Sequence, residues 1–139
     1  MSPRLLSLAA AIALCACGTA LAKPKVIIRW SKTGGFAGTS QVLRIRSDNL
    51  ALAGPKGVNP YPVQLGAGQV AKLRQVLDAA KLASSKRHYP APGAADTFQY
   101  SVTYKGHTVD GDQTKLPKRI MRAMRALQKT YDDMFASSE

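Results

Sequence analysis

The feature that most constrains the fold is a strict alternation of apolar and polar side chains in residues 97–104. In a strand, one face there would carry Phe98, Tyr100, Val102 and Tyr104, and the other would carry Thr97, Gln99, Ser101 and Thr103. Alternation of this kind is typical of a sheet with one buried face and one face in water. The chain must therefore supply apolar surfaces that cover a single face of a sheet.

Other segments predict the remaining elements. Strands are expected at residues 26–31, 40–46 and 107–110, and helices at residues 69–83 and from Pro117 onwards. The expected buried stripes are Leu43 and Ile45 in the second strand, Val70, Leu73, Val76, Leu77 and Ala80 in the first helix, and Ile120, Met121, Met124, Leu127 and Tyr131 in the second. The order ββαββα predicts an α+β fold, with a four-stranded, mostly antiparallel sheet and two helices packed on one face.

The connections can also be predicted. Lys105 and Gly106 predict a tight turn between two strands. Residues 53–62 hold three prolines and two glycines, which predict an irregular surface loop. The residues from about Asp132 to the end are expected to fray.

Residues 1–22 are typical of an export signal. Arg4 precedes an apolar run, and Ala20-Leu21-Ala22 forms a cleavage site of the A-x-A type. The run is too short to predict a membrane span. We favour cleavage after Ala22, which leaves residues 23–139 as one domain, periplasmic or secreted. The alternative is a lipobox at residues 14–17, which would make Cys17 a lipidated N-terminus in the bacterial envelope.

Cysteine content and charge narrow the class of protein further. Both cysteines lie inside the predicted signal, so the mature chain has no disulfide and depends on its core. The whole chain carries a formal net charge of +12, and loss of Arg4 leaves +11. Such a charge favours acidic partners, such as a protein face, lipopolysaccharide or a membrane. Nucleic acid is a less favoured candidate partner, because exported proteins rarely meet it.

No residue pattern indicates catalysis. His88 and His107 lack a second ligand at metal-binding spacing, and no serine lies in a Gly-x-Ser-x-Gly elbow. Asp110-Gly111-Asp112 lacks the further oxygen ligands of an EF-type calcium loop and predicts a plain turn with an Asx hydrogen bond. We therefore expect no enzyme activity, no metal and no cofactor.

A glycine-rich loop, residues 33–39, places Phe36 among three glycines. It opens into a strand, so it is neither a Walker motif nor a dinucleotide fingerprint. Taken alone, it favours a hairpin connection with Phe36 folded back on the core. The alternative is that Phe36 enters a pocket on a partner.

The second predicted helix carries a strongly basic face, with Lys118, Arg119, Arg122, Arg125 and Lys129 and no acid between residues 118 and 129. This face could meet an anionic partner. The apolar stripe on the same helix would suit a helix lying on a membrane surface, but in so small a domain we favour core packing.

Two motifs together resemble the emfourin family, whose members are small protein inhibitors of thermolysin-like zinc metallopeptidases. These motifs are Gly34-Gly35-Phe36-Ala37-Gly38 and residues 92–100, Pro-Gly-Ala-Ala-Asp-Thr-Phe-Gln-Tyr. The resemblance runs from about Val26 to Leu127, while the export signal, residues 53–62 and the basic charge depart from the family. It implies a metallopeptidase as partner.

If the resemblance holds, the loop would block the active-site cleft of the peptidase. Our hypothesis for the inhibitory loop comprises Thr33, Gly34, Gly35, Phe36, Ala37, Gly38 and Thr39. Four nearby cations are expected to steer the protein towards an acidic cleft, namely Arg29, Lys32, Arg44 and Arg46.

Overall fold

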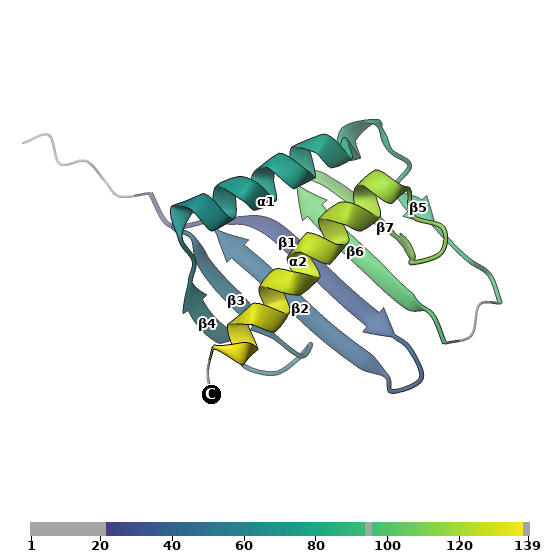
Figure 1. The fold of residues 1–139 in the computed structure, drawn as a ribbon, viewed down its shortest axis with the longest axis horizontal. Helices are drawn as coiled ribbons and strands as arrows, with labels where there is room; N and C mark the ends of the chain where they lie inside the picture. The colour runs from purple at the N-terminus through teal and green to yellow at the C-terminus, as the bar shows by residue number, and fades with distance from the viewer. Residues whose placement is uncertain (1–21, 94–95, 138–139) are drawn as a thin grey trace, which may run out of the picture.

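The computed structural model describes residues 22–93 and 96–137, and it has an α+β architecture (Figure 1). The strands are β1 (Val26–Gly34), β2 (Thr39–Arg46), β3 (Leu50–Gly54), β4 (Tyr61–Gln64), β5 (His88–Tyr89), β6 (Phe98–Tyr104) and β7 (His107–Asp112). The helices are α1 (Ala67–Ala80), the short 3₁₀ helix η1 (Leu82–Ser84) and α2 (Lys118–Ala136). Of the predicted export signal, all but Ala22 lies outside the described residues, and so does Cys17.

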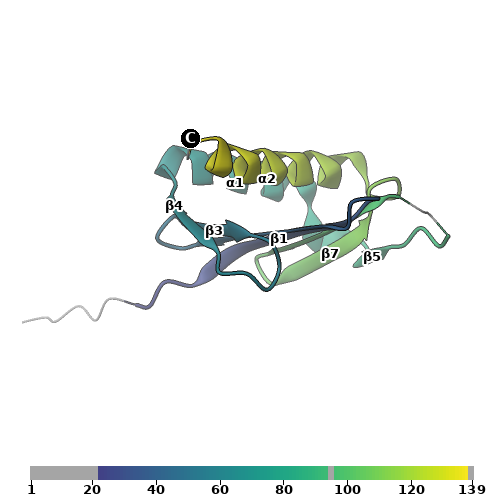
Figure 2. The ribbon, with the colours of Figure 1, turned by 90° about the horizontal axis from the view of Figure 1, so that it is seen from below.

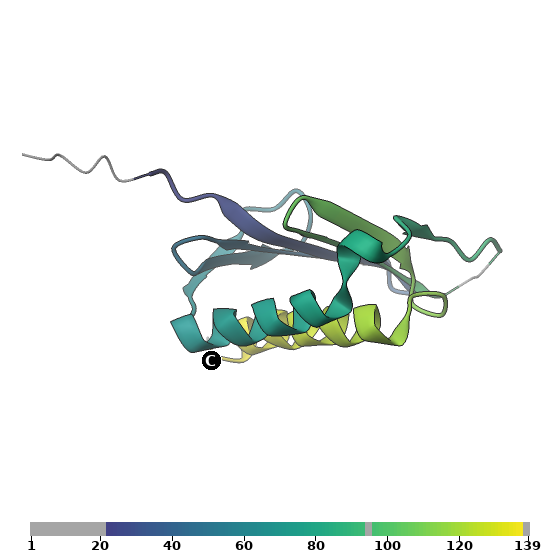
Figure 3. The ribbon, with the colours of Figure 1, turned by 90° about the horizontal axis from the view of Figure 1, so that it is seen from above.

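The strands form one sheet in the order β4-β3-β2-β1-β6-β7-β5. All neighbouring strands are antiparallel except β5 and β7, which pair in parallel. Both long helices lie on the same side of this sheet and run in opposite directions (Figures 1 and 2), and the opposite view leaves the other face uncovered by helices (Figure 3). The predicted α+β fold with two helices is confirmed, but the predicted count of four strands was wrong.

The three strands that the sequence did not reveal lie at the two edges of the sheet. Residues 53–62 were expected to be irregular, yet Ala53 and Gly54 end β3, and Tyr61 and Pro62 begin β4. Pro62 is compatible with β4 because an edge strand has one row of backbone groups that need no partner. Only the tip between these strands is free of ladder pairing.

The core lies between the helices and the sheet, as the periodic patterns predicted. Trp30 of β1 is 1% exposed and sits between Tyr100 of β6 and Tyr131 of α2, with ring centroids 6.3 and 5.9 Å away. The predicted stripe positions Leu43, Ile45, Val70, Leu73, Leu77, Ala80, Ile120, Met124, Leu127 and Tyr131 are all buried. Val76 and Met121 are half-buried and pack against the same core.

The helix boundaries differ from the predicted ones. Helix α1 begins two residues earlier than expected and ends at Ala80, because Lys81 adopts the left-handed conformation (φ 51°). Helix α2 does not fray from Asp132 but continues to Ala136, since Met134 is buried in the core. The Lys105-Gly106 turn is confirmed, with positive φ at both residues, as a two-residue hairpin with the usual strand twist requires.

Candidate functional site

The β1–β2 hairpin presents Phe36 to solvent. Thr33 and Gly34 end β1 and Thr39 begins β2, so the turn itself comprises only residues 35–38. The Gly38 N–H closes this turn by donating to the Gly35 carbonyl at 3.1 Å. Phe36 is 95% exposed, the largest exposed fraction of any large apolar side chain in the described residues.

The expectation that Phe36 folds back on the core was therefore wrong. The space beside the turn is already filled by Phe98, whose ring carbons lie 2.6–3.3 Å from where a Cβ on Gly35 would sit. Phe98 itself packs against the core, so no room is left for a second aromatic ring.

Two glycines allow the hairpin to lie directly against the start of β6. A Cβ on Gly34 (φ 100°) would lie 2.7 Å from the Thr97 carbonyl oxygen, too close for any other residue. The Gly35 N–H donates to the same oxygen at 3.1 Å. The two sequence motifs therefore meet at one end of the sheet, through Gly34 and Gly35 of the first motif and Thr97 and Phe98 of the second.

A buried carboxylate organises the strand end beside this contact. Asp112 is 0% exposed and accepts hydrogen bonds from the Thr97 hydroxyl, from Gln99 Nε2 at 3.0 Å, and from the Thr114 N–H at 2.8 Å and hydroxyl. Burial alone would raise the pKa of Asp112, but these hydrogen bonds outweigh it and hold the pKa below its ordinary value. Asp112 thus fixes the position of Thr97, and the Thr97 carbonyl oxygen accepts the hydrogen bond that holds the hairpin.

The Asp-Gly-Asp segment is only partly a turn. Asp110 to Asp112 belong to β7, which corrects the expected strand end at Asp110. Asp112 does form the expected Asx hydrogen bond, to the N–H two residues later. Asp110 contacts His88 Nδ1 at 2.8 Å in an exposed pair.

The four cations expected to steer a partner do not form one patch. Arg29 and Arg44 lie opposite each other on the face of the sheet without helices. Lys32 lies on the helix side, with its Nζ 4.0 Å from the Phe98 ring centroid. Arg46 is paired with Asp48 at 2.7 Å. Only Lys32 is therefore close to the base of the loop.

The basic face of α2 is less uniform than its sequence indicated. Arg119 is tied to α1 and its continuation, donating to the Ala80 carbonyl at 3.0 Å and to Ser85 Oγ at 2.9 Å. Lys129 pairs with Asp133 at 2.6 Å. Lys118, Arg122 and Arg125 remain exposed and form no ion pair within residues 22–93 and 96–137. The apolar stripe of this helix is core, so it is not free to lie on a membrane.

Two other kinds of site are absent from the part of the chain that the structure describes. No group of three or more His, Cys, Asp or Glu side chains there is arranged to hold a metal ion. No helix in the same residues is long and apolar enough to cross a membrane. No protein-family model matches the chain, and no curated protein matches it significantly.

Proposed function

We propose that the protein is an exported inhibitor of thermolysin-like zinc metallopeptidases, and that the hairpin at residues 33–39 enters the active-site cleft. The observation that carries this proposal is Phe36, 95% exposed on a turn whose base is fixed to β6. A fully exposed phenylalanine contributes nothing to the core, whereas buried aromatic anchors commonly dominate protein interfaces.

The physical argument concerns shape and preorganisation. Peptidases of this class, as the emfourin resemblance implies, have an apolar pocket beside the zinc that accepts bulky side chains. The Phe36 ring would fill this pocket while the flanking backbone lies in the cleft as a poor substrate. Since Gly34 and Gly35 are held against Thr97 and Phe98, binding would order few further residues, which lowers the entropic cost.

Charge would assist the encounter without fixing its geometry. Lys32 lies two residues before the glycines, and the mature chain is strongly positive. Such a field raises the association rate with an acidic cleft more than it raises affinity. The protein has no catalytic role in this account.

The test is inhibition of thermolysin by the Phe36→Ala variant. We expect binding to weaken by about 2 kcal/mol or more, roughly 30-fold in the inhibition constant, because the anchor is lost. The free energy of unfolding should change by less than about 0.5 kcal/mol, since the side chain has no packing partner in the free protein.

Two further variants sharpen the comparison. Phe36→Leu keeps a bulky apolar side chain and should retain most of the inhibition. Val58→Ala trims another exposed apolar residue, 60% exposed on the β3–β4 hairpin, and serves as the control for loss of apolar surface in general. Equal inhibition by wild type and Phe36→Ala would show that Phe36 does not anchor the protein to the peptidase. Absence of inhibition, combined with salt-sensitive binding to anionic vesicles, would favour the second candidate, an envelope protein that uses Lys118, Arg122 and Arg125.

A further inference from the structure

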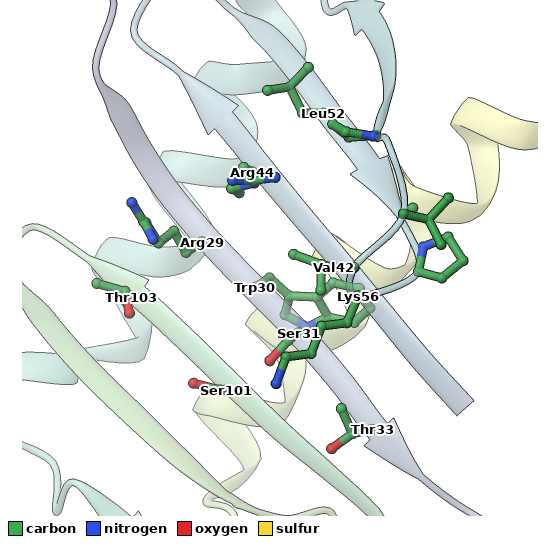
Figure 4. Close-up of a pocket in the computed structure, with 15 residues that line it drawn as sticks. Arg29, Trp30, Ser31, Thr33, Val42, Arg44, Leu52, Lys56, Ser101 and Thr103 are labelled. Carbon is green, nitrogen blue, oxygen red and sulfur yellow. The ribbon is translucent and has the colours of Figure 1, made fainter. Parts of the chain in front are cut away.

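The face of the sheet without helices carries a pocket of about 440 Å³. Its floor consists of residues in register on four strands: Leu52, Arg44, Arg29 and Thr103 form one row, and Gly54, Val42, Ser31 and Ser101 form the next. The loop at residues 55–60 lines one side, and Lys56 from this loop joins Arg29 and Arg44 around the pocket (Figure 4). The volume is within the range of small-molecule sites.

The pocket gathers positive charge without compensation. Arg29 and Arg44 are direct cross-strand neighbours, an arrangement that like charges make unfavourable. None of the residues that line the pocket is acidic. Arg29, Arg44 and Lys56 form no ion pair with any described residue, and the buried Nε of Arg44 has no hydrogen-bond acceptor among them. An anion bound between the guanidinium groups would relieve the repulsion between them.

The other lining residues differ between the two sides of the pocket. The side towards β3 carries the apolar side chains Leu52, Val42 and Val58, together with Lys56 from the loop. The side towards β6 carries hydroxyl groups, with Ser31 and Ser101 opposite each other in the strand register. Hydroxyl groups next to arginines are suited to the oxygen atoms of an acid.

We propose that this pocket binds a small amphiphilic anion, with a carboxylate or phosphate head between Arg29 and Arg44 and a short apolar body against Leu52, Val42 and Val58. The site lies on the sheet beside the base of the β1–β2 hairpin: Thr33 lines it, whereas residues 35–38 of the turn do not. Its occupancy does not depend on the proposed inhibition. The charge is local, set by three cations around one concave surface, so this binding differs from general attraction to the basic chain.

The test is a titration of the isotope-labelled protein with hexanoate, in which the NMR chemical shifts of the backbone amides are measured. We expect saturable shifts in β1, β2 and β6 around Ser31, Arg44 and Ser101, with little change in α2. Hexanol and hexylammonium have the same body without the negative head, and both should bind at least tenfold more weakly. Inorganic phosphate has a head without a body, and it should also bind more weakly than hexanoate.

Variants separate the pocket from net charge. Arg29→Gln and Arg44→Gln should each weaken hexanoate binding at least tenfold, whereas Arg122→Gln on the exposed face of α2 removes the same charge and should leave it unchanged. Arg29 is exposed, so its variant tests the site even if the half-buried Arg44 proves necessary for folding. Three results would overturn the proposal: no saturable shift, equal binding of hexanol, or equal weakening by Arg122→Gln. If phosphate bound as tightly as hexanoate, the proposed contact of an apolar body with Leu52, Val42 and Val58 would be wrong.

Discussion

At the residue scale, the decisive position next to the hairpin is Asp112, for which the sequence alone predicted only a plain turn with an Asx hydrogen bond. Its carboxylate is buried and satisfied by Thr97, Gln99 and Thr114. The sequence does contain a pattern that indicates this network. The two-residue turn at Lys105-Gly106 fixes the register of β6 and β7 and places Gln99 opposite Asp112. An acid opposite two polar residues on one face is a candidate for a hydrogen-bond network.

Asp112→Asn should lower the free energy of unfolding at pH 7 by about 1–3 kcal/mol, because an amide nitrogen would replace an acceptor that faces only donors. Asp110→Asn is the matched control. Its exposed pair with His88 should contribute only about 0–1 kcal/mol. Chemical denaturation of the three proteins measures these differences, and equal stability of wild type and Asp112→Asn would contradict the role of the network.

The pH dependence of that difference has a definite sign. The pKa of Asp112 is lowered in the folded protein, so its carboxylate adds stability above the ordinary value of 3.8. This contribution is lost as the pH falls below that value through the folded-state pKa. The gap in unfolding free energy between wild type and Asp112→Asn should therefore be constant from pH 7 to 5 and shrink in more acidic solution.

At the element scale, the sequence predicted the helices and the four central strands because each has a clear period. The edge strands have none: β5 has two residues, and β4 contains a proline. They are held by long-range pairing, such as the Asp110 N–H to the Arg87 carbonyl at 2.8 Å, which no local pattern encodes. The position of Phe36 was unpredictable for a similar reason, since it depends on Phe98 filling the space beside Gly35.

The pairing of β5 with β7 rests on Gly111. A Cβ there would lie 2.6 Å from Tyr89 Cβ and 2.8 Å from the Tyr89 carbonyl oxygen, so β5 would have to move. Gly111→Ala should cost about 1–3 kcal/mol in unfolding free energy and speed amide exchange at Asp110. Gly68→Ala, in the first turn of α1 with open space around it, should be neutral or stabilising. A neutral Gly111→Ala would show that β5 is free to shift.

At the scale of the whole molecule, the two sides of the sheet differ in structure. The helix side supplies the core, and the described residues contain no cysteine that could add a disulfide to it. The other side holds the basic pocket, and one end of the sheet presents the Phe36 turn. The formal net charge of the whole chain, +12, is the reason why we propose acidic partners.

The most direct measurement is a titration of thermolysin with purified residues 23–139, in which hydrolysis of a peptide substrate is followed. When the enzyme concentration is well above the inhibition constant, we expect peptidase activity to fall linearly with added protein. It should reach zero near an equimolar ratio of protein to enzyme. The onset of inhibition should slow as salt is raised, because screening weakens electrostatic steering. Full enzyme activity in the presence of excess folded protein would contradict the proposed inhibition.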